Sequence, residues 1–238
     1  MKILALESSA VAASVAVSED GALIAQSYQR SGLTHSRTLL PMCRDLLENC
    51  GLTLGEMDVV AVAAGPGSFT GLRIGVATAK GLAWPGDKPC AGVSTLEAMA
   101  WPLAHLEGDL CAVMDARRHQ VYNARFQAEG GRLLRLCPDR AISIDELAAE
   151  LLSREKTQIL VGDGAELCYN ELTKRGLPVR LAPPHLRWQS AWGVARAAEE
   201  LARTGGLVTA AELAPVYHRL SQAERERLAR QQAAADDR

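Results

Sequence analysis

The stretch that decides the fold of this chain is residues 57–84, MDVVAVAAGPGSFTGLRIGVATAKGLAW. Its residues 59–63 form a short, continuous apolar run, which is typical of a strand buried on both faces. The Gly-Pro-Gly that follows ends the strand, because glycine allows positive φ and proline fixes φ and lacks an N–H. Ser68 or Thr70 can then cap a helix that continues to Ala83.

The predicted helix is apolar on more than one side, although each internal glycine weakens a helix by up to about 1 kcal/mol relative to alanine. Its apolar residues fall on two sides, with Gly71, Gly75, Ala79 and Leu82 on one and Ile74, Ala77 and Gly81 on the other. Such a helix is buried on two sides. Packing inside one domain explains this pattern, and the alternative is that the flat flank around Gly71 and Gly75 is covered by another chain.

The glycine turn also has the form of an anion site, since a strand, a glycine turn and a helix N-terminus direct free N–H groups at one spot. It is not a Walker A loop, because Leu72 and Arg73 stand where lysine and serine or threonine are needed. A tight turn required for packing explains the glycines equally well. The residues kept as nucleotide or anion candidates are Gly65, Gly67, Ser68, Arg73 and Asp115.

The length of the chain, 238 residues, fits one large domain or two small ones and supplies an ample core. A formal net charge of −2 gives no strong electrostatic footprint for nucleic acid. The six cysteines form no Cys-x-x-Cys pair, so we expect reduced thiols of a cytoplasmic protein. Glu7 interrupts the apolar N-terminus, which argues against a signal peptide, and no membrane span is expected.

The order of predicted elements, βββαβαβα, occurs twice. The first half has strands at 3–6, 12–17 and 22–28, a helix ending near residue 50, the unit described above, a strand at 89–93 and a helix at 95–104. In the first of these helices, Thr38 is the predicted cap and Pro41 lies in the first turn. The second half has strands at 110–114, 120–127 and 132–136, a helix at 144–152, a strand at 158–161, a helix at 167–175, a strand at 179–181 and a helix at 189–203.

A duplicated α/β unit implies two similar lobes with a cleft between them. The order resembles the two tandem RNase H-like lobes of the actin, sugar-kinase and Hsp70 ATPase architecture. We predict an N-terminal lobe over 1–103, a C-terminal lobe over 104–212, and a segment over 213–238 that docks on the first lobe and ends in a frayed terminus. The last helix is expected to be able to return to the first lobe.

In ATPases of this architecture the phosphates lie between two hairpins, which correspond here to the turns after Glu7 and Asp115. These two carboxylates are oxygen ligands of the kind that hold Mg²⁺ through water. Ser8-Ser9 and Ala116-Arg117 replace the glycines of active enzymes. We therefore predict a degenerate nucleotide cleft with no cofactor of its own.

No metal cluster and no activated nucleophile is expected. Leu39 stands four residues after His35, where a helix-borne metal site needs its second ligand, so His35 is predicted to be a cap or an interface residue. Arg117, Arg118 and His119 form a small basic cluster that either contacts RNA phosphates or ends a strand in solvent.

Three segments together resemble the bacterial TsaB (YeaZ) family: residues 65–75, GPGSFTGLRIG, residues 115–122, DARRHQVY, and residues 213–217, LAPVY. The stretch HSRTLLP at 35–41 is similar as well. The resemblance covers about the whole chain except the charged tail. Two features depart from it, namely His218-Arg219, where the family more often has an apolar residue before the arginine, and the long Arg/Glu/Ala tail itself.

The resemblance implies a cytoplasmic, non-catalytic subunit of the machinery that makes N6-threonylcarbamoyladenosine at tRNA position 37. It implies a heterodimer with the catalytic subunit TsaD through the first two helices, joined by the ATPase TsaE, with ATP or ADP at the interface. It also implies self-pairing in isolation through the same surface, and tRNA contact only within the complex. The predicted interface residues are His35, Leu39, Cys43, Leu46, Phe69, Gly71, Leu72, Gly75, Val76, Ala79 and Lys80.

Three rival functions follow from the residues. An active ATP-dependent phosphotransferase of the same fold is opposed by the degenerate turns, and a metalloprotease is opposed by the missing histidine pair. A homodimeric binding module without a link to tRNA is the third. For the interface hypothesis, we expect Gly75→Arg to abolish pairing while the monomer stays folded.

Overall fold

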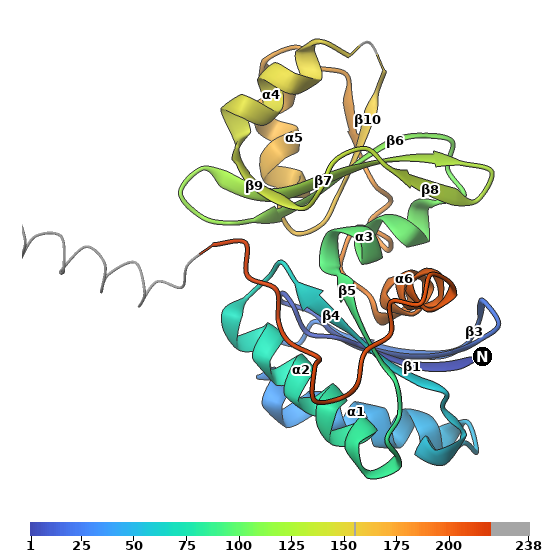
Figure 1. The fold of residues 1–238 in the computed structure, drawn as a ribbon. Helices are drawn as coiled ribbons and strands as arrows, with labels where there is room; N and C mark the ends of the chain where they lie inside the picture. The colour runs from blue at the N-terminus through green and yellow to red at the C-terminus, as the bar shows by residue number, and fades with distance from the viewer. Residues whose placement is uncertain (155, 220–238) are drawn as a thin grey trace, which may run out of the picture.

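The computed structural model describes residues 1–154 and 156–219, and it contains two β-sheets, one in each lobe (Figure 1). The first sheet has the order β3-β2-β1-β4-β5. Its strands are β1 (Lys2–Glu7), β2 (Ala13–Glu19), β3 (Ala22–Gln29), β4 (Val59–Gly65) and β5 (Cys90–Ser94). The second sheet has the order β11-β10-β6-β7-β8, with β9 added on β7. Its strands are β6 (Gly108–Asp115), β7 (Gln120–Glu129), β8 (Arg132–Arg135), β9 (Arg140–Ser143), β10 (Gln158–Val161) and β11 (Val179–Leu181).

The two sheets are built on one plan. In each half the first three strands form an antiparallel meander, and the fourth and fifth add in parallel on the other side of the first strand. Counted within each half, both orders are 3-2-1-4-5. The predicted two-lobed α/β fold with a repeated unit is therefore confirmed. Strand β9 is an addition that the sequence pattern did not predict.

The helices lie in three layers around these sheets (Figure 1). Helices α1 (His35–Asn49) and α2 (Phe69–Ala83) cover the outer face of the first sheet. Helices α3 (Thr95–Ala100) and α6 (Ala191–Arg203) lie between the sheets, and α4 (Ile144–Leu152) and α5 (Ala165–Lys174) cover the outer face of the second sheet. Short 3₁₀ turns span Leu54–Glu56, Trp84–Gly86 and Trp101–Leu103. Helix α6 packs on the first sheet and on α3, while the lobe limits at 103 and 212 stay predictions.

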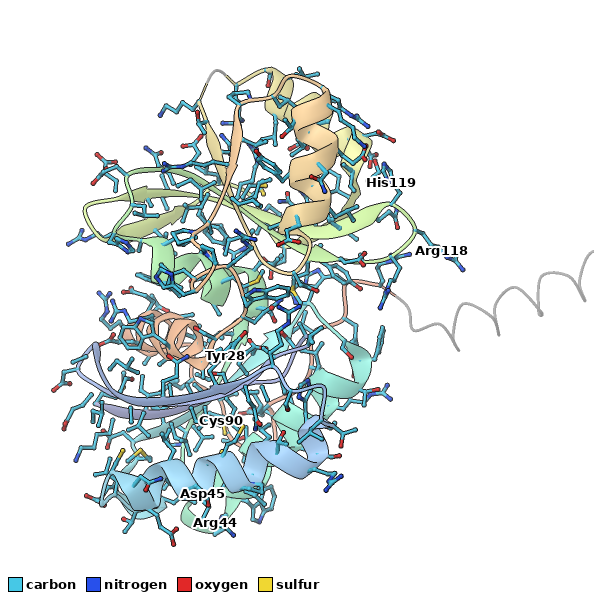
Figure 2. The ribbon with its side chains drawn as sticks, turned by 180° about the vertical axis from the view of Figure 1, so that it is seen from behind. Tyr28, Arg44, Asp45, Cys90, Arg118 and His119 are labelled. Atoms are coloured by element: carbon cyan, nitrogen blue, oxygen red, sulfur yellow. The ribbon has the colours of Figure 1, made fainter. Side chains whose placement is uncertain are left out.

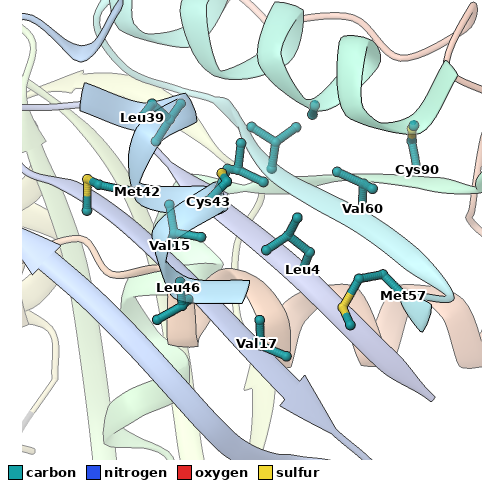
Figure 3. Packing of buried hydrophobic residues seen from close by; sticks show 14 of the residues in the cluster. Leu4, Val15, Val17, Leu39, Met42, Cys43, Leu46, Met57, Val60 and Cys90 are labelled. Carbon is teal, nitrogen blue, oxygen red and sulfur yellow. The ribbon is translucent and has the colours of Figure 1, made fainter. Parts of the chain in front are cut away.

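Strand β4 is buried at all seven positions, as its unbroken apolar sequence requires. The core beneath it is formed with α1, whose Leu39, Cys43 and Leu46 point at the sheet (Figure 3). All six cysteines are free thiols, and burial raises the pKa of Cys43 and Cys111 to about 12. These two thiols therefore behave as core residues.

The predicted start of α1 was wrong. The helix begins at His35, with Thr34 rather than Thr38 as the N-cap, and Pro41 lies inside it. The first turn is held by a contact of 2.7 Å between His35 Nε2 and the carbonyl oxygen of Ala10, on the β1–β2 turn. Because Pro41 is on the exposed side, its missing N–H removes only one helical bond.

The chain after α6 returns along the first lobe, and we call residues 208–219 the C-terminal strap. Val208 pairs with Cys90, and Leu213 is buried in the core under α2. Lys80 Nζ donates to the carbonyl oxygens of Ala211 and Leu213, both at 3.0 Å. The rest of the predicted C-terminal segment, 220–238, lies outside the described residues. None of the helices in residues 1–154 and 156–219 is long and apolar enough to cross a membrane.

Candidate functional site

A cleft of about 520 Å³ opens between the lobes, where the turns after β1 and β6 face each other. The turn after β1 leads into β2 and is contacted by the start of α2, and the turn after β6 leads into β7. The lining residues are Ser9, Ala10, Val11, Gly67, Ser68, Phe69, Met114, Asp115, Ala116, Arg117, Tyr122, Asp163 and Arg219. The structure thus brings the two predicted hairpin turns to one cleft.

Each first strand ends in a carboxylate that accepts a hydrogen bond from the backbone N–H two residues later. Glu7 Oε1 accepts from Ser9 N at 2.6 Å, and Asp115 Oδ1 accepts from Arg117 N at 2.7 Å. The repeated topology and this repeated bond place Glu7 and Asp115 at equivalent positions in the two lobes.

Glu7 is fully buried, and its Oε2 has no hydrogen-bond partner. Burial raises the pKa of Glu7 to about 7, and the negative charge of Asp163 adds to the effect. Burial also raises the pKa of Asp163, against a hydrogen bond of 2.8 Å that Gln189 Nε2 donates to its Oδ1. Burial thus raises the pKa of Asp163, which lines the cleft, and of Glu7, which lies buried behind it.

The fit of a nucleotide phosphate and its Mg²⁺ is poor at the β1–β2 turn. Ser8 and Ser9 are buried, and the start of α2 lies directly on them, with Ser68 N donating to Ser9 O at 2.7 Å. A Cβ on Gly67 would lie 2.6 Å from Ser9 O. Within the described residues, no group of three or more His, Cys, Asp or Glu is arranged to hold a metal ion. Packing explains why Gly67 must be glycine.

The flat flank of α2 was predicted to be free for a partner, and this was wrong. A Cβ on Gly71 would lie 2.1 Å from the carbonyl oxygen of Ser8, and one on Gly75 would lie 2.4 Å from Ser8 Oγ and 3.1 Å from Val62. Ser8 Oγ donates to the carbonyl oxygen of Gly71 at 3.0 Å. The chain's own β1–β2 turn and sheet cover this flank. Gly75→Arg would therefore disrupt the fold and does not test pairing.

The remaining interface candidates divide into two groups. Leu39, Cys43, Leu46, Leu72, Val76 and Ala79 are buried within the chain, as Gly71 and Gly75 are. His35, Phe69 and Lys80 are half-buried. The spacing of apolar residues along α2 shows that two of its sides are apolar, but it does not show which neighbouring segment covers each side.

The other anion candidates have partners inside the chain. Gly65 lies against the strap, where an added Cβ would be 2.2 Å from Val216 O. Ser68 caps α2 by accepting from Gly71 N at 3.4 Å. Arg73 Nε donates to Tyr217 Oη at 3.0 Å, and the rings of Phe69 and Tyr217 stack at 4.6 Å. Their roles toward a nucleotide stay predictions.

The turn after β6 is conformationally strained. Arg117, Arg118 and His119 have φ values of 65°, 56° and 58°, a region that L-residues other than glycine rarely adopt. Arg219 Nη1, from the strap, donates to Ala116 O in this turn at 2.6 Å. Sequence reasoning found the basic cluster but not the strap that joins it to α2.

The family model described as TsaD, tRNA N6-adenosine threonylcarbamoyltransferase, matches residues 29–170. The chain is 33% identical to the tRNA threonylcarbamoyladenosine biosynthesis protein TsaB of Bacillus subtilis over 167 residues, or 70% of this chain and 73% of that protein. It is 39% identical to TsaB of Escherichia coli over 54% of this chain, a match that spans only 56% of that relative.

Solved structures agree with the sequence relatives. YeaZ from Pseudomonas aeruginosa superposes with a TM-score of 0.75 at 29% identity, covering 91% of this chain and 99% of that one. Component A of the Acidaminococcus fermentans (R)-2-hydroxyglutaryl-CoA dehydratase, at a TM-score of 0.50 and 12% identity over 85% of this chain and 99% of that one, shares the fold alone. The chain belongs to the TsaB (YeaZ) family of tRNA threonylcarbamoyladenosine biosynthesis proteins, a family related to TsaD.

Proposed function

We propose that this chain is a non-catalytic subunit of the tRNA threonylcarbamoyladenosine pathway that binds TsaD and stabilises its active conformation. The outer face of α1 and α2 carries the proposal. The two helices lie side by side over the first sheet, and their outer face looks away from the rest of the molecule (Figure 1). The turn after Glu7, whose Ser8 and Ser9 are buried under the start of α2 and replace the glycines of active ATPases, supports the absence of catalysis.

The outer face of α1 and α2 exposes several apolar residues to solvent. Leu40 is 53% exposed and Trp84, just after α2, is 67% exposed. Ala77 and Gly81 are also exposed, and nothing lies within 4 Å of a Cβ placed on Gly81. Small residues at these positions would let the backbone of a partner helix approach closely. Arg44 and Asp45 lie on the same outer side and point away from the sheet (Figure 2).

The proposed contact surface thus moves from the Gly71 flank to the side with Ala77 and Gly81. A stable interface buries roughly 1,600 Å² in total, so α1 and α2 should both contribute. We further propose that TsaE joins the heterodimer, that ATP or ADP lies near this interface, and that the isolated chain pairs with itself through the same face.

The test replaces Ala77 with arginine. Because Ala77 is exposed, Ala77→Arg should leave the fold intact and weaken co-purification with TsaD at least about tenfold, by placing a long charge in the seam. Ala149→Arg, on the exposed side of α4, is the matched control and should bind normally. Undiminished binding and tRNA modification with Ala77→Arg would remove α2 from the interface.

The alternative is an ATP-dependent phosphotransferase, which the carboxylate-lined cleft favours. In that case the purified chain alone should hydrolyse ATP, and Asp115→Ala should abolish the activity. We expect no turnover with either protein.

A further inference from the structure

The mouth of the cleft holds an aromatic stack next to a basic turn. Phe69, at the start of α2, and Tyr217, in the strap, are parallel within 16°, with ring centroids 4.6 Å apart. The Arg73 guanidinium lies 5.9 Å and 5.8 Å from the two ring centroids, and its Nε bonds to the Tyr217 hydroxyl. Tyr217 is 42% exposed, so the outer surface of the stack is open.

The basic turn supplies cations across the cleft from this stack. Arg117 and Arg219 line the cleft together with Phe69, and Arg219 ties the strap to Ala116. Arg118 and His119 extend outward at the tip of the turn (Figure 2). In the left-handed conformation of this turn, the backbone N–H groups of Arg118 and His119 donate to no acceptor among the described residues. Successive free N–H groups of this kind form a concavity that suits an anion.

Two acidic residues, Asp115 and Asp163, also line the cleft and offset part of this charge. Asp115 accepts a hydrogen bond from Arg117 N through its Oδ1, and burial raises the pKa of Asp163. Outside the cleft, Asp145 and Glu171 lie near His119. Arg73 therefore lies beside the aromatic platform, Arg117 and Arg219 line the cleft with Phe69, and Arg118 adds a cation at the tip of the basic turn, on a chain whose overall net charge is −2.

We propose that this mouth binds a single-stranded segment of RNA, with one unpaired base stacked on the Phe69–Tyr217 pair and adjacent phosphates on Arg117, Arg118 and the free N–H groups. An aromatic platform with a flanking basic groove is the arrangement that holds unpaired bases. The platform is fixed in advance by the Arg73–Tyr217 bond and by Val216 N, which donates to Ala64 O at 2.8 Å. Binding therefore loses little ordering entropy.

The inference rests on the proposed function in one respect, since a tRNA-modifying assembly supplies the RNA. The site is separate from the proposed TsaD surface around Ala77 and Gly81, which gives each proposal its own variants. Ala77→Arg should leave RNA binding unchanged, and Tyr217→Ala should leave TsaD binding unchanged.

The experiment measures anisotropy of a labelled tRNA anticodon stem-loop with the full chain, alone and with TsaD. Tyr217→Ala should weaken binding roughly tenfold by loss of base stacking. Tyr28→Ala is the matched control, because Tyr28 is 43% exposed, lies on β3 and is not among the residues that line the cleft. Arg118→Gln should lower the salt dependence by about one phosphate contact, while Arg180→Gln on β11 should not.

Three results would overturn the proposal. The first is equal affinity for the stem-loop and for a fully paired duplex, which would show that no unpaired base is bound. The second is equal weakening by Tyr217→Ala and Tyr28→Ala. The third is complete displacement of the stem-loop by ATP, which would make a free nucleotide the ligand of the cleft.

Discussion

The turns after β1 and β6 occupy equivalent places in the two lobes, yet their surroundings are opposite. Glu7, Ser8 and Ser9 are at most 1% exposed, because the start of α2 lies on them. Asp115 is exposed, and three residues in left-handed conformation follow soon after it. Both turns keep the bond from a carboxylate to the N–H two residues later. The two turns therefore keep the same side-chain-to-backbone hydrogen bond, but only the turn after β1 is buried by a neighbouring helix.

The helix that follows the fourth strand produces this difference. In the first lobe a Cβ on Gly71 would be 2.1 Å from Ser8 O, whereas in the second lobe a Cβ on Gly164 would be 3.0 Å from Asp115 N. Gly71 lies inside α2 and Gly164 is the N-cap of α5, so what separates the two lobes is the burial of the turns themselves: the turn after β1 is buried under α2, while Asp115 and residues 117–119 after β6 are exposed. In the first lobe the turn after β1 is buried against α2. In the second lobe the turn after β6 stays open to solvent and to the cleft.

The largest expected difference between the two lobes is in the loss of stability when each of these glycines is replaced by alanine. Gly71→Ala forces a methyl group into a backbone oxygen and should lower the free energy of unfolding by about 3 kcal/mol or more. Gly164→Ala meets a milder contact and should cost about 1 kcal/mol. Urea unfolding of the three proteins measures both values.

Gly81→Ala is the control within α2. Nothing lies within 4 Å of the added methyl, so the higher helix propensity of alanine should stabilise the protein by up to about 1 kcal/mol. Equal effects of Gly71→Ala and Gly81→Ala would show that helix propensity, and not the contact with Ser8, governs both positions.

The glycines also show where sequence reasoning succeeds and where it stops. Apolar periodicity predicted almost every strand and helix, because burial of a strand or a helix face leaves a local pattern. The neighbour of Gly71 is Ser8, 63 residues earlier, and the partner of Arg73 is Tyr217, 144 residues later. The spacing of apolar residues within one helix contains no such long-range information. The Gly71 and Gly75 side of α2 was therefore assigned to a partner chain instead of to the chain's own β1–β2 turn.

Two local misses have physical reasons of the same kind. Strand β9 has one buried residue and no apolar run, so its pairing with β7 leaves no local signal in the sequence. Pro41 suggested a later helix start, but tertiary contacts at His35 and Leu39 hold the preceding turn in place. The meeting of the turns after Glu7 and Asp115 was predicted because the repeated element order resembles that of the two-lobed ATPases, whose phosphates lie between two such hairpins.

The buried carboxyl of Glu7 gives a pH-dependent test of the sealed lobe. A folded pKa of about 7, raised above the ordinary value near 4.5, means that the folded state holds the proton more tightly. The resulting cost is absent below about pH 4.5, grows as pH rises, and reaches about 3 kcal/mol above pH 7. Glu7→Gln, which stays neutral, should therefore stabilise the protein at pH 8 much more than at pH 5.

Unfolding by urea at both pH values measures this difference. Asp115→Asn, at the equivalent exposed position, keeps an oxygen acceptor for Arg117 N and should change stability by about 0.5 kcal/mol or less at either pH. A stabilisation by Glu7→Gln that is the same at pH 5 and pH 8 would contradict the assignment of a protonated carboxyl to the first lobe.

The smallest expected effect concerns the open turn of the second lobe. Arg118 at a φ of 56° carries strain that glycine does not, since a side chain costs roughly 1–2 kcal/mol in this region. Arg118→Gly should raise the free energy of unfolding by about 1 kcal/mol, reduced by the greater freedom of glycine in the unfolded chain. Arg37→Gly, in the first turn of α1, should instead destabilise by about 1 kcal/mol. If Arg118→Gly both stabilises the protein and weakens RNA binding, the strained conformation at Arg118 is kept for binding and not for stability.

If Arg118→Gly instead lowers the stability, the Arg118 side chain supports the turn. The turns after β1 and β6 would then differ only in how deeply they are buried.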